Sequence, residues 1–451
     1  MNENYFIELT DEVSDFLRKK CDYEFSVLAD YVSKSSLEKN SGKIVESLSK
    51  TKYELSVRII TNENDYLIAL DNFDDWKYRL SRELKKIKGK RVDFFLNDKR
   101  DEVFFKRNIF DKYSSRDIKS MLNIKAERYH ARMSYLAHLR IFQTANSRIL
   151  QYFPRSSFSI TMLSKKIQDT VSQTAAKIGF LEGLNVEETV SNANSLLKDL
   201  ESSKPLSGGV FDIVADSKLT ATFVHEALGH ASEGDLVKRQ ESCLYGKLNK
   251  KIASDVVSIY DSSVVEDEPL WGSFAYDDEG NPAKKTKIVD SGYLRNYLTN
   301  LKVYHEFAKD LGLNNTSNAR AMDPFNFPLV RMTNTYIEKG DHSEEELLEE
   351  LREGLYLKSS LGGQVNTTEG TFQFYTQLGY VVKNGKILYP IKGASLKGNI
   401  LTTLKNIECV GKKYGQDSVG TCGKGAQSVP VGGRNPSILI RSALIGGTNE
   451  R

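Results

Sequence analysis

The sequence has few of the features that mark membrane or secreted proteins. Its 451 residues contain no apolar run of about 18 residues or more, which excludes a transmembrane helix. The first six residues have neither a basic region nor an apolar core, so we expect no signal peptide. The four cysteines, at positions 21, 243, 409 and 422, lack the spacing of a disulfide framework. These absences predict a cytoplasmic protein with reduced thiols.

The chain also lacks an excess of charge of one sign. It has 63 basic and 60 acidic residues, for a net charge of +3. Proteins that bind nucleic acid or anionic membranes usually carry a clear basic surplus, so we expect neither partner here. The basic run at 85–91 is interpreted as solvated surface. A hydrophobic content of 39% is ordinary for a globular chain that is long enough for two or three domains.

Residue patterns in the first 200 positions predict a mixed α/β unit. Its early elements are expected at residues 8–20 (helix, with Thr10 as the N-cap), 21–32, 55–60 and 66–70 (strands) and 73–90 (helix). From about 115 to 200, apolar residues at helical spacing predict a mostly helical region, with helices at 116–138, 161–178 and 187–201.

The segment 202–209, rich in serine and glycine with one proline, is the clearest break in the chain. We therefore expect an N-terminal α/β domain at 1–205 and a second domain at 206–451. Short strands and polar turns dominate the second domain, and Asn384-Gly385 predicts a β-hairpin. A capping box at 343–346 predicts the start of a helix that runs to 353. The expected fold class is α+β, with a β-rich C-terminal antiparallel sheet or barrel.

A metal-binding motif lies near the start of this second domain. His225-Glu226-Ala227-Leu228-Gly229-His230 has two imidazoles and a carboxylate, which are the parts of a hydrolytic zinc site. In a regular helix, residues five apart point about 140° away from each other. A one-residue π-bulge would bring both rings to one face, and Gly229 would give the backbone freedom for it. The alternative is a buried, hydrogen-bonded histidine pair on an amphipathic helix.

A third ligand would decide between these alternatives. Cys422 lies in the glycine-rich segment 419–433, where we expect an irregular backbone to present its thiol rather than pack it. As a thiolate it could complete a His₂Cys zinc site and leave the fourth position for water. Cys243 and Cys409 remain competitors, because spacing alone does not select one cysteine.

The motif residues resemble the TldD/PmbA family of metalloproteases, and in particular its zinc-bearing TldD-type branch. The resemblance is carried by 225–230, 233–235 and the segment Thr421-Cys422-Gly423-Lys424, with further agreement at 331–335, 354–356, 362–366 and 370–374. It is specific from about 205 to 440 and looser before that.

This resemblance implies that His225, His230 and Cys422 bind zinc and that Glu226 is the catalytic carboxylate. It also implies a two-domain fold with a β-rich second domain. The partner implied is either a second copy of the chain or a related sister subunit, and the implied substrates are peptides.

Further polar residues leave two interpretations open. Glu233 is either an acceptor for the N–H of a ligand imidazole or a solvated carboxylate near a helix end. Four residues in loop-like segments either bind substrate and stabilise an oxyanion or fix their loops: Asn318, Arg320, Arg331 and Asn334.

We therefore expect a zinc-dependent metallopeptidase that cleaves small or unfolded peptides, with Glu226 as the general base toward metal-activated water. The β-rich domain would accept the peptide extended, as an added strand. A zinc-stabilised modulator or scaffold subunit is the first alternative, but a structural site needs no general base. A hydrolase of another amide bond, such as a γ-glutamyl bond, is the second. The sequence specifies neither the physiological substrate nor the cleavage preference.

Overall fold

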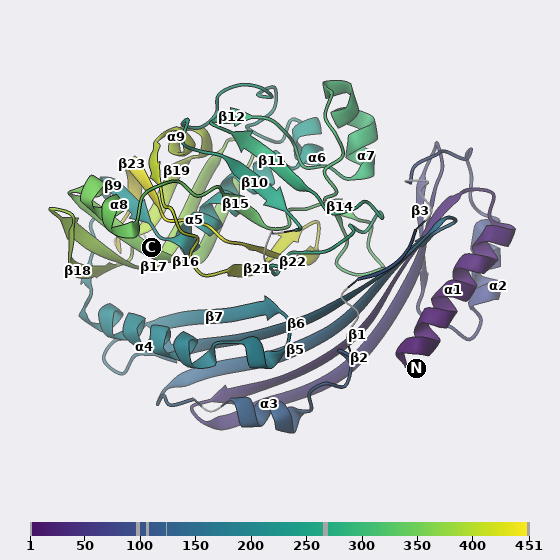
Figure 1. The fold of residues 1–451 in the computed structure, drawn as a ribbon, viewed down its shortest axis with the longest axis horizontal. Coiled ribbons are helices and arrows are strands. Elements are labelled where there is room, and N and C mark those ends of the chain that lie inside the picture. Colours follow the sequence, from purple (N-terminus) through teal and green to yellow (C-terminus); the bar gives the residue numbers. More distant parts are fainter. Residues whose placement is uncertain (1, 96–99, 105–107, 123, 265–268, 449–451) are drawn as a thin grey trace.

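The computed structural model describes residues 2–95, 100–104, 108–122, 124–264 and 269–448. A sheet of seven strands forms the N-terminal part (Figure 1). Its order is β3-β2-β1-β5-β6, and β6 pairs along different parts of its length with β4 and β7. The strands are β1 (Glu24–Asn40), β2 (Lys43–Ile60), β3 (Asp65–Leu70), β4 (Arg100–Phe104), β5 (Tyr129–Thr144), β6 (Ser147–Leu163) and β7 (Thr170–Ile178).

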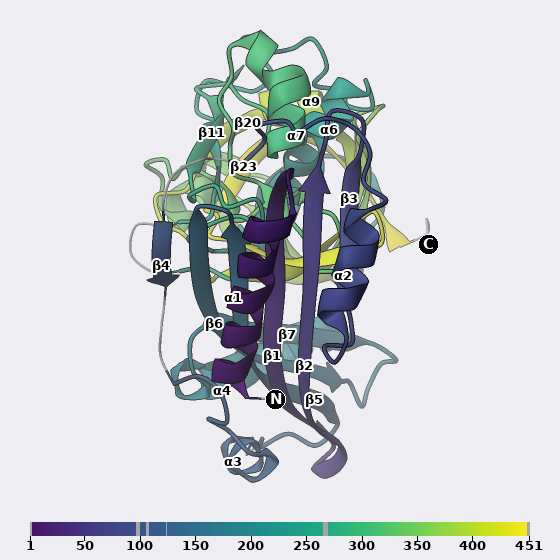
Figure 2. The ribbon, with the colours of Figure 1, turned by 90° about the vertical axis from the view of Figure 1, so that its right-hand side faces the viewer.

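Helices cover the outside of this sheet, and the sheet curves so that its concave face turns toward the C-terminal part (Figures 1 and 2). The helices are α1 (Glu3–Lys20), α2 (Trp76–Leu84), α3 (Ser115–Met121) and α4 (Val186–Ser202). In α1, Phe6, Val13 and Leu17 are buried, as expected for one apolar helix face. The N-cap is Asn2 rather than the predicted Thr10, because Thr10 lies inside the helix and donates to the carbonyl of Phe6.

The helical prediction for 115–200 is wrong over most of its length. Among the described residues of this range, the α-helices are α3 and α4, and the predicted helices at 116–138 and 161–178 are largely replaced by β5, β6 and β7. Along β5 the odd-numbered residues from Tyr129 to Leu139 are buried, and the even-numbered ones between them are exposed or half-buried. That period of two is the pattern of a strand with one face on a core. The predicted strand at 21–32 corresponds to β1, which starts three residues later and runs on to Asn40.

The C-terminal part contains a closed β-barrel. Its strands are β9 (Gly209–Ala215), β16 (Gly354–Asn366), β17 (Thr371–Lys383), β19 (Ser395–Asn399) and β23 (Ile438–Gly446). The order is β16-β9-β23-β19-β17, and the barrel closes because β17 also pairs with β16. The expected fold class, α+β with a β-rich C-terminal part, is thereby confirmed. The boundary between 205 and 206 stays a prediction.

Further elements extend the barrel. The predicted Asn384-Gly385 turn joins β17 to β18, and α8 starts with the predicted capping box of Ser343 and Glu346. The remaining elements near the barrel are β8 (Lys204–Pro205), β18 (Lys386–Lys392), β20 (Ile407–Val410), α8 (Glu344–Leu351) and α9 (Ile400–Lys405).

Small sheets and short helices lie beside the barrel and complete the C-terminal part (Figure 1). They are β10 (Ile259–Ser262), β11 (Lys285–Asp290), β12 (Tyr293–Leu294) and β15 (Thr335–Ile337); the pairs β13 (Ala319–Arg320) with β14 (Leu329–Val330) and β21 (Ser418–Lys424) with β22 (Gln427–Gly433); and α6 (Gly234–Lys238) and α7 (Leu301–Val303).

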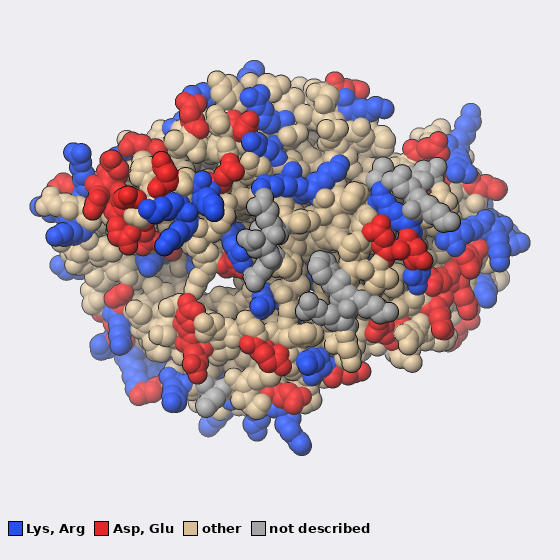
Figure 3. Space-filling model, in the orientation of Figure 1, with Lys and Arg blue, Asp and Glu red and all other residues tan. Residues whose placement is uncertain are grey.

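Buried ion pairs join the two parts of the chain. Arg140 on β5 bonds Asp30 on β1 at 2.6 Å and Asp278 in the C-terminal part at 2.7 Å. Arg58 on β2 bonds Glu279 at 2.7 Å. On the surface, Lys and Arg lie interspersed with Asp and Glu, and the molecule is hollowed where its two parts meet (Figure 3). Within the described ranges, no helix has the length and apolar content needed to cross a bilayer.

Candidate metal centre

A distorted helix positions the two motif histidines. Asp216 caps α5 (Ser217–Phe223), which continues as a π-helix over Val224–Gly229. The backbone N–H of His230 donates to the carbonyl of His225, the i→i+5 bond of a π-turn. The ring centroids of His225 and His230 lie 5.4 Å apart. The predicted π-distortion is therefore confirmed, and it brings the two imidazoles together.

The role of Gly229 differs from the predicted one. Its backbone has ordinary right-handed helical angles, φ −55° and ψ −56°, which any residue adopts. A Cβ atom at this position would lie 2.0 Å from the sulfur of Met332, which is itself fully buried. Glycine fits here because the π-helix packs directly against the Met332 side chain, which would have to move to admit a Cβ atom.

Cys422 on β21 completes the cluster. Its Sγ lies 3.3 Å from Nε2 of His230, and one ligand atom each of His225, His230 and Cys422 lies within 4.8 Å of the others. Among the described residues, no other group of three His, Cys, Asp or Glu side chains meets this criterion. The competing thiols lie elsewhere, Cys409 on β20 and Cys243 beside Gly370.

The residues of this cluster fit a zinc ion. Two imidazole nitrogens and one thiolate are a donor set that zinc prefers. Nε2 of His225 is buried and has no hydrogen-bond partner within the described chain, as expected of an atom whose partner is a metal. The Cys422 side chain is also buried, although a glycine-rich hairpin carries it.

Electrostatics favour an ionised thiol. Burial opposes ionisation of Cys422, but the adjacent imidazoles of His225 and His230 outweigh it and lower the pKa of Cys422 to about 5. Burial likewise disfavours protonation of His230, yet Cys422 and Glu233 raise its pKa to about 10. The thiolate form is the one that binds metal.

Glu233 contacts His230 on the side of the ring that faces away from Cys422. Its side chain is fully buried, and its Oε2 lies 3.2 Å from Nδ1 of His230. Lys424 donates to the same oxygen at 3.1 Å and to Asp235 at 2.7 Å. Burial would raise the pKa of Glu233, but His230 and Lys424 outweigh it and lower the pKa. This geometry favours the acceptor interpretation of Glu233 over the solvated one, and it adds Lys424, two residues after Cys422, which sequence reasoning missed.

Glu226 lies beside the cluster and stays open to solvent. Its Oε2 is 3.7 Å from Nε2 of His230, and its side chain is 34% exposed. The carboxylate can therefore reach a water molecule next to the three ligand atoms without being one of them.

The four loop residues hold their surroundings in place. Arg331 is completely buried and donates to the backbone carbonyls of Cys422 and Gln427, which fixes the β21–β22 hairpin. Asn318 donates to Asp261, and its second amide bond goes to the carbonyl of Arg331. The other two also bond backbone, Arg320 to the carbonyl of Met332 and Asn334 to Ser262 and Gly272. These contacts favour the loop-fixing alternative.

The sequence of this chain matches those of known proteins. Residues 208–447 match the family described as the PmbA/TldA metallopeptidase C-terminal domain. A metalloprotease of Methanocaldococcus jannaschii is 34% identical over 90% of this chain and 84% of its own length. The chain belongs to the TldD/PmbA family of metalloproteases. Every residue of the His225, His230 and Cys422 cluster lies inside the matched segment.

Two further relatives with similar sequences are also named as metalloproteases. A metalloprotease of Methanothermobacter thermautotrophicus is 43% identical over 59% of this chain and 57% of its own length, so this match spans little more than half of that protein. A protein of Saccharolobus solfataricus called a zinc metalloprotease TldD homolog is 32% identical over 69% of each chain.

Solved structures share the fold of this family member. A Thermotoga maritima protein described as a proposed modulator of a DNA gyrase has a TM-score of 0.77 at 20% identity, over 98% of this chain and 100% of that chain. TldE from Thermococcus kodakarensis has a TM-score of 0.76 at 16% identity, over 97% and 100%. At these identities the likeness concerns the fold alone.

Proposed function

We propose that this TldD/PmbA protein is a zinc-dependent peptidase in which His225, His230 and Cys422 hold the metal and Glu226 is the general base. The observation that carries the proposal is the meeting of three ligand atoms within 4.8 Å of one another, with the Glu226 carboxylate 3.7 Å from His230. A relative named as a zinc metalloprotease supports the choice of metal.

The chemistry divides between the metal and the chain. A zinc ion held by these residues would supply a Lewis acid that acidifies water and polarises a carbonyl. Oε2 of Glu226 takes a proton from the attacking water and returns it to the nitrogen of the departing amine. Glu233 accepts a hydrogen bond from Nδ1–H of His230, which leaves Nε2 of His230 as the atom that would bind the metal. A modulator without catalysis has no use for Glu226 in this position.

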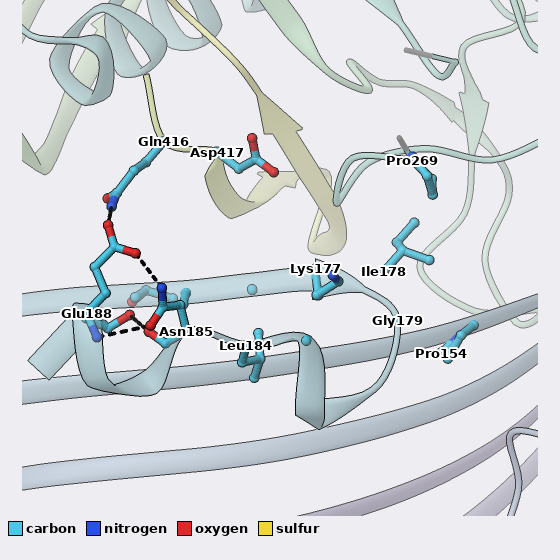
Figure 4. A pocket seen from close by; sticks show the side chains of 15 residues that line it. Pro154, Lys177, Ile178, Gly179, Leu184, Asn185, Glu188, Pro269, Gln416 and Asp417 are labelled. Carbon is cyan, nitrogen blue, oxygen red and sulfur yellow. Dashed lines mark hydrogen bonds between the residues drawn. The ribbon is translucent and has the colours of Figure 1, made fainter. Parts of the chain in front are cut away.

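The fold offers a place for an extended peptide. Strand β7 pairs with β6 along one edge, and its other edge pairs with no strand in the described parts of the chain. Strand β21, which carries Cys422, contacts β7. A pocket of about 380 Å³ opens beside β7, lined also by Asn185 and Glu188 at the start of α4 and by Gln416 and Asp417 before β21 (Figure 4). A peptide added along this edge beside the pocket, at residues 174–178, would pair through its backbone, which selects extension rather than sequence.

We also propose that the protein pairs with a second copy or with a related sister subunit. The likeness to TldE, although limited to the fold, supports a family of subunits of one shape. Light scattering of the purified chain, alone and with cell extract from its own source, gives the mass of the assembly.

Substitution of the proposed ligands and base tests the function. We expect wild type to bind one zinc per chain and to cleave an unstructured peptide. His225→Ala and Cys422→Ala should lose both metal and cleavage, whereas Glu226→Gln should keep the metal and lose at least about 100-fold in turnover. Cys243→Ala is the matched control, because it removes a thiol outside the cluster. Metal analysis and mass spectrometry of the products are the measurements.

Full zinc occupancy in Cys422→Ala would contradict the ligand assignment. Loss of zinc in Glu226→Gln would make Glu226 a ligand rather than a base. Wild type with stoichiometric zinc that cleaves no peptide would favour a modulator or another amide as substrate.

A further inference from the structure

A separate cavity of about 230 Å³ lies between the N-terminal sheet and the C-terminal part. Side chains of β1, β2, β5 and β6 form one wall, and segments 273–278, 319–323 and 429–430 form the other. Val429 lines the cavity and lies directly across the β21–β22 hairpin from Cys422. Paired residues of a hairpin point to the same face. The cavity is therefore next to the metal cluster but is not part of it.

Arg155 is the unusual residue of this cavity. It lines the cavity from β6 and is only 6% exposed. Among the residues that the structure describes, its guanidinium has no ion pair and no hydrogen-bond partner, and its Nε is fully buried. Its contacts are ring faces, with Phe153 at 4.8 Å and Trp271 at 5.9 Å from the guanidinium carbon. A buried cation without a counter-anion is costly, and proteins rarely keep one without a use for it.

The acidic groups around the cavity are already engaged. Of the five acidic residues that line the cavity, Asp30 and Asp278 both form ion pairs with Arg140. The other three have partners of their own: Glu54 pairs with Lys52, Asp277 accepts from Asn281, and Asp323 accepts from Asn326. Arg320 also lines the cavity and likewise has no ion pair within the described chain. Burial, and then the charges of Arg320 and Arg140, lower the pKa of Arg155 to about 9, so that it is still a cation at neutral pH.

We propose that this cavity binds a carboxylate of the peptide ligand, with Arg155 as its counter-cation. The planar guanidinium matches a carboxylate in two parallel hydrogen bonds. The volume is below the roughly 300–1,000 Å³ of a usual ligand pocket, so it holds one residue of a peptide rather than a longer stretch. The carboxylate comes from either the chain end or an acidic side chain. The inference rests on the proposed function insofar as the ligand is a peptide.

Binding to zinc-loaded Glu226→Gln protein tests the cavity without turnover. Three N-acetylated alanine hexapeptides serve as probes: one with a free C-terminal acid, one with a C-terminal amide, and one amide with a single internal glutamate. We expect the amide without glutamate to bind at least 10-fold more weakly than at least one of the two peptides that carry a carboxylate. The acid that binds better identifies the source of the carboxylate. Fluorescence of Trp271, which lies beside Arg155, reports the binding.

Arg155→Gln in the same background should bind all three peptides equally. Arg132→Gln is the matched control, because Arg132 is a half-exposed arginine on the neighbouring strand β5. Without peptide, the thermal midpoint of Arg155→Gln should stay level or rise, because an unpaired buried charge is removed. A purely structural arginine would lower it instead. Arg155→Met gives the same comparison without a polar replacement.

The outcomes separate this inference from the proposed function. Equal binding of the three peptides by the Glu226→Gln protein, or an unchanged preference after Arg155→Gln, overturns the carboxylate site and leaves zinc hydrolysis standing. A carboxylate preference that depends on Arg155, in a protein that cleaves nothing, supports the site and overturns the peptidase proposal.

Discussion

At the scale of single residues, Gly229 lets the π-helix pack closely against the buried side chain of Met332. We expect Gly229→Ala to lower the free energy of unfolding by about 1–3 kcal/mol, because the new methyl group overlaps a buried sulfur. Urea denaturation measures the change. The double variant Gly229→Ala with Met332→Ala should cost less than the sum of the two single changes. An additive double variant would show that the two side chains do not compete for the same space.

Glu233 allows a second test at this scale. Glu233→Gln keeps the shape of the side chain but removes the charge that His230 and Lys424 contact. We expect zinc affinity to fall by about 10–100-fold, because the carboxylate orients the ligand imidazole. Competition with a chromophoric chelator measures it. Glu241→Gln, at an exposed carboxylate paired with Arg239, should bind zinc as wild type does. Equal affinities in the two variants would assign Glu233 to folding alone.

Single residues were predictable where their partners are close in sequence. His225, Glu226 and His230 fall within six positions, and their spacing alone predicts the distortion that joins them. Cys422 lies 192 residues from His230, and local sequence did not exclude its competitors. The contact of Lys424 with Glu233 spans 191 residues and was not predicted. Such pairings depend on how β21 lies against the π-helix, which no local pattern encodes.

At the scale of the element, the π-helix makes a spacing of five residues equivalent to a spacing of four on a regular helix. Deletion of Ala227 should convert the π-turn to an α-turn and leave both histidines on one face. We therefore expect this variant to keep zinc binding, at a cost in stability from shifted packing. Insertion of one alanine after Ala227 should rotate His230 by about 100° and abolish metal binding. Metal analysis and circular dichroism follow both. Zinc retained by the insertion variant would contradict this account.

The strands β5 and β6 show why an element can be misassigned. Apolar residues such as Met133, Leu136 and Ala137 occur at helical spacing, but Leu136 is only half-buried on the other face of β5. What decides the conformation is pairing along nearly the whole length of β5 with β1 and β6. A local window contains neither partner. Where the signal was local, as in the Asn384-Gly385 hairpin and the Ser343 capping box, the prediction held.

At the scale of the whole molecule, Arg140 joins the two parts of the chain, because it pairs with Asp30 in the N-terminal sheet and with Asp278 in the C-terminal part. We expect Asp30→Asn to lower the free energy of unfolding by about 3–5 kcal/mol, because it leaves part of the Arg140 charge uncompensated in a buried site. Urea denaturation at neutral pH measures this loss. Asp15→Asn, at an exposed pair with Arg18, should change it by less than about 1 kcal/mol.

The same carboxylate predicts a pH dependence. Burial opposes ionisation of Asp30, but Arg140 and His138 hold its pKa well below the usual range. In the unfolded chain an aspartate side chain has a pKa of about 3.9. The stability that Asp30 contributes is therefore fully present above that pH and is lost as the pH falls below it. Wild type should therefore lose more stability between pH 5 and pH 3 than Asp30→Asn does. Parallel pH profiles of the two proteins would contradict this origin.

The barrel order has a consequence for how the protein is made. Strand β23 lies between β9 and β19, so the ring of strands stays open until residue 446 has been synthesised. The Cys422 sulfur also arrives late, nearly two hundred residues after the histidines that it meets. A nascent chain that has not yet reached residue 422 thus holds neither the closed barrel nor the full cluster. As the proposed peptidase, the chain would cut no other polypeptide before residue 446 has been synthesised.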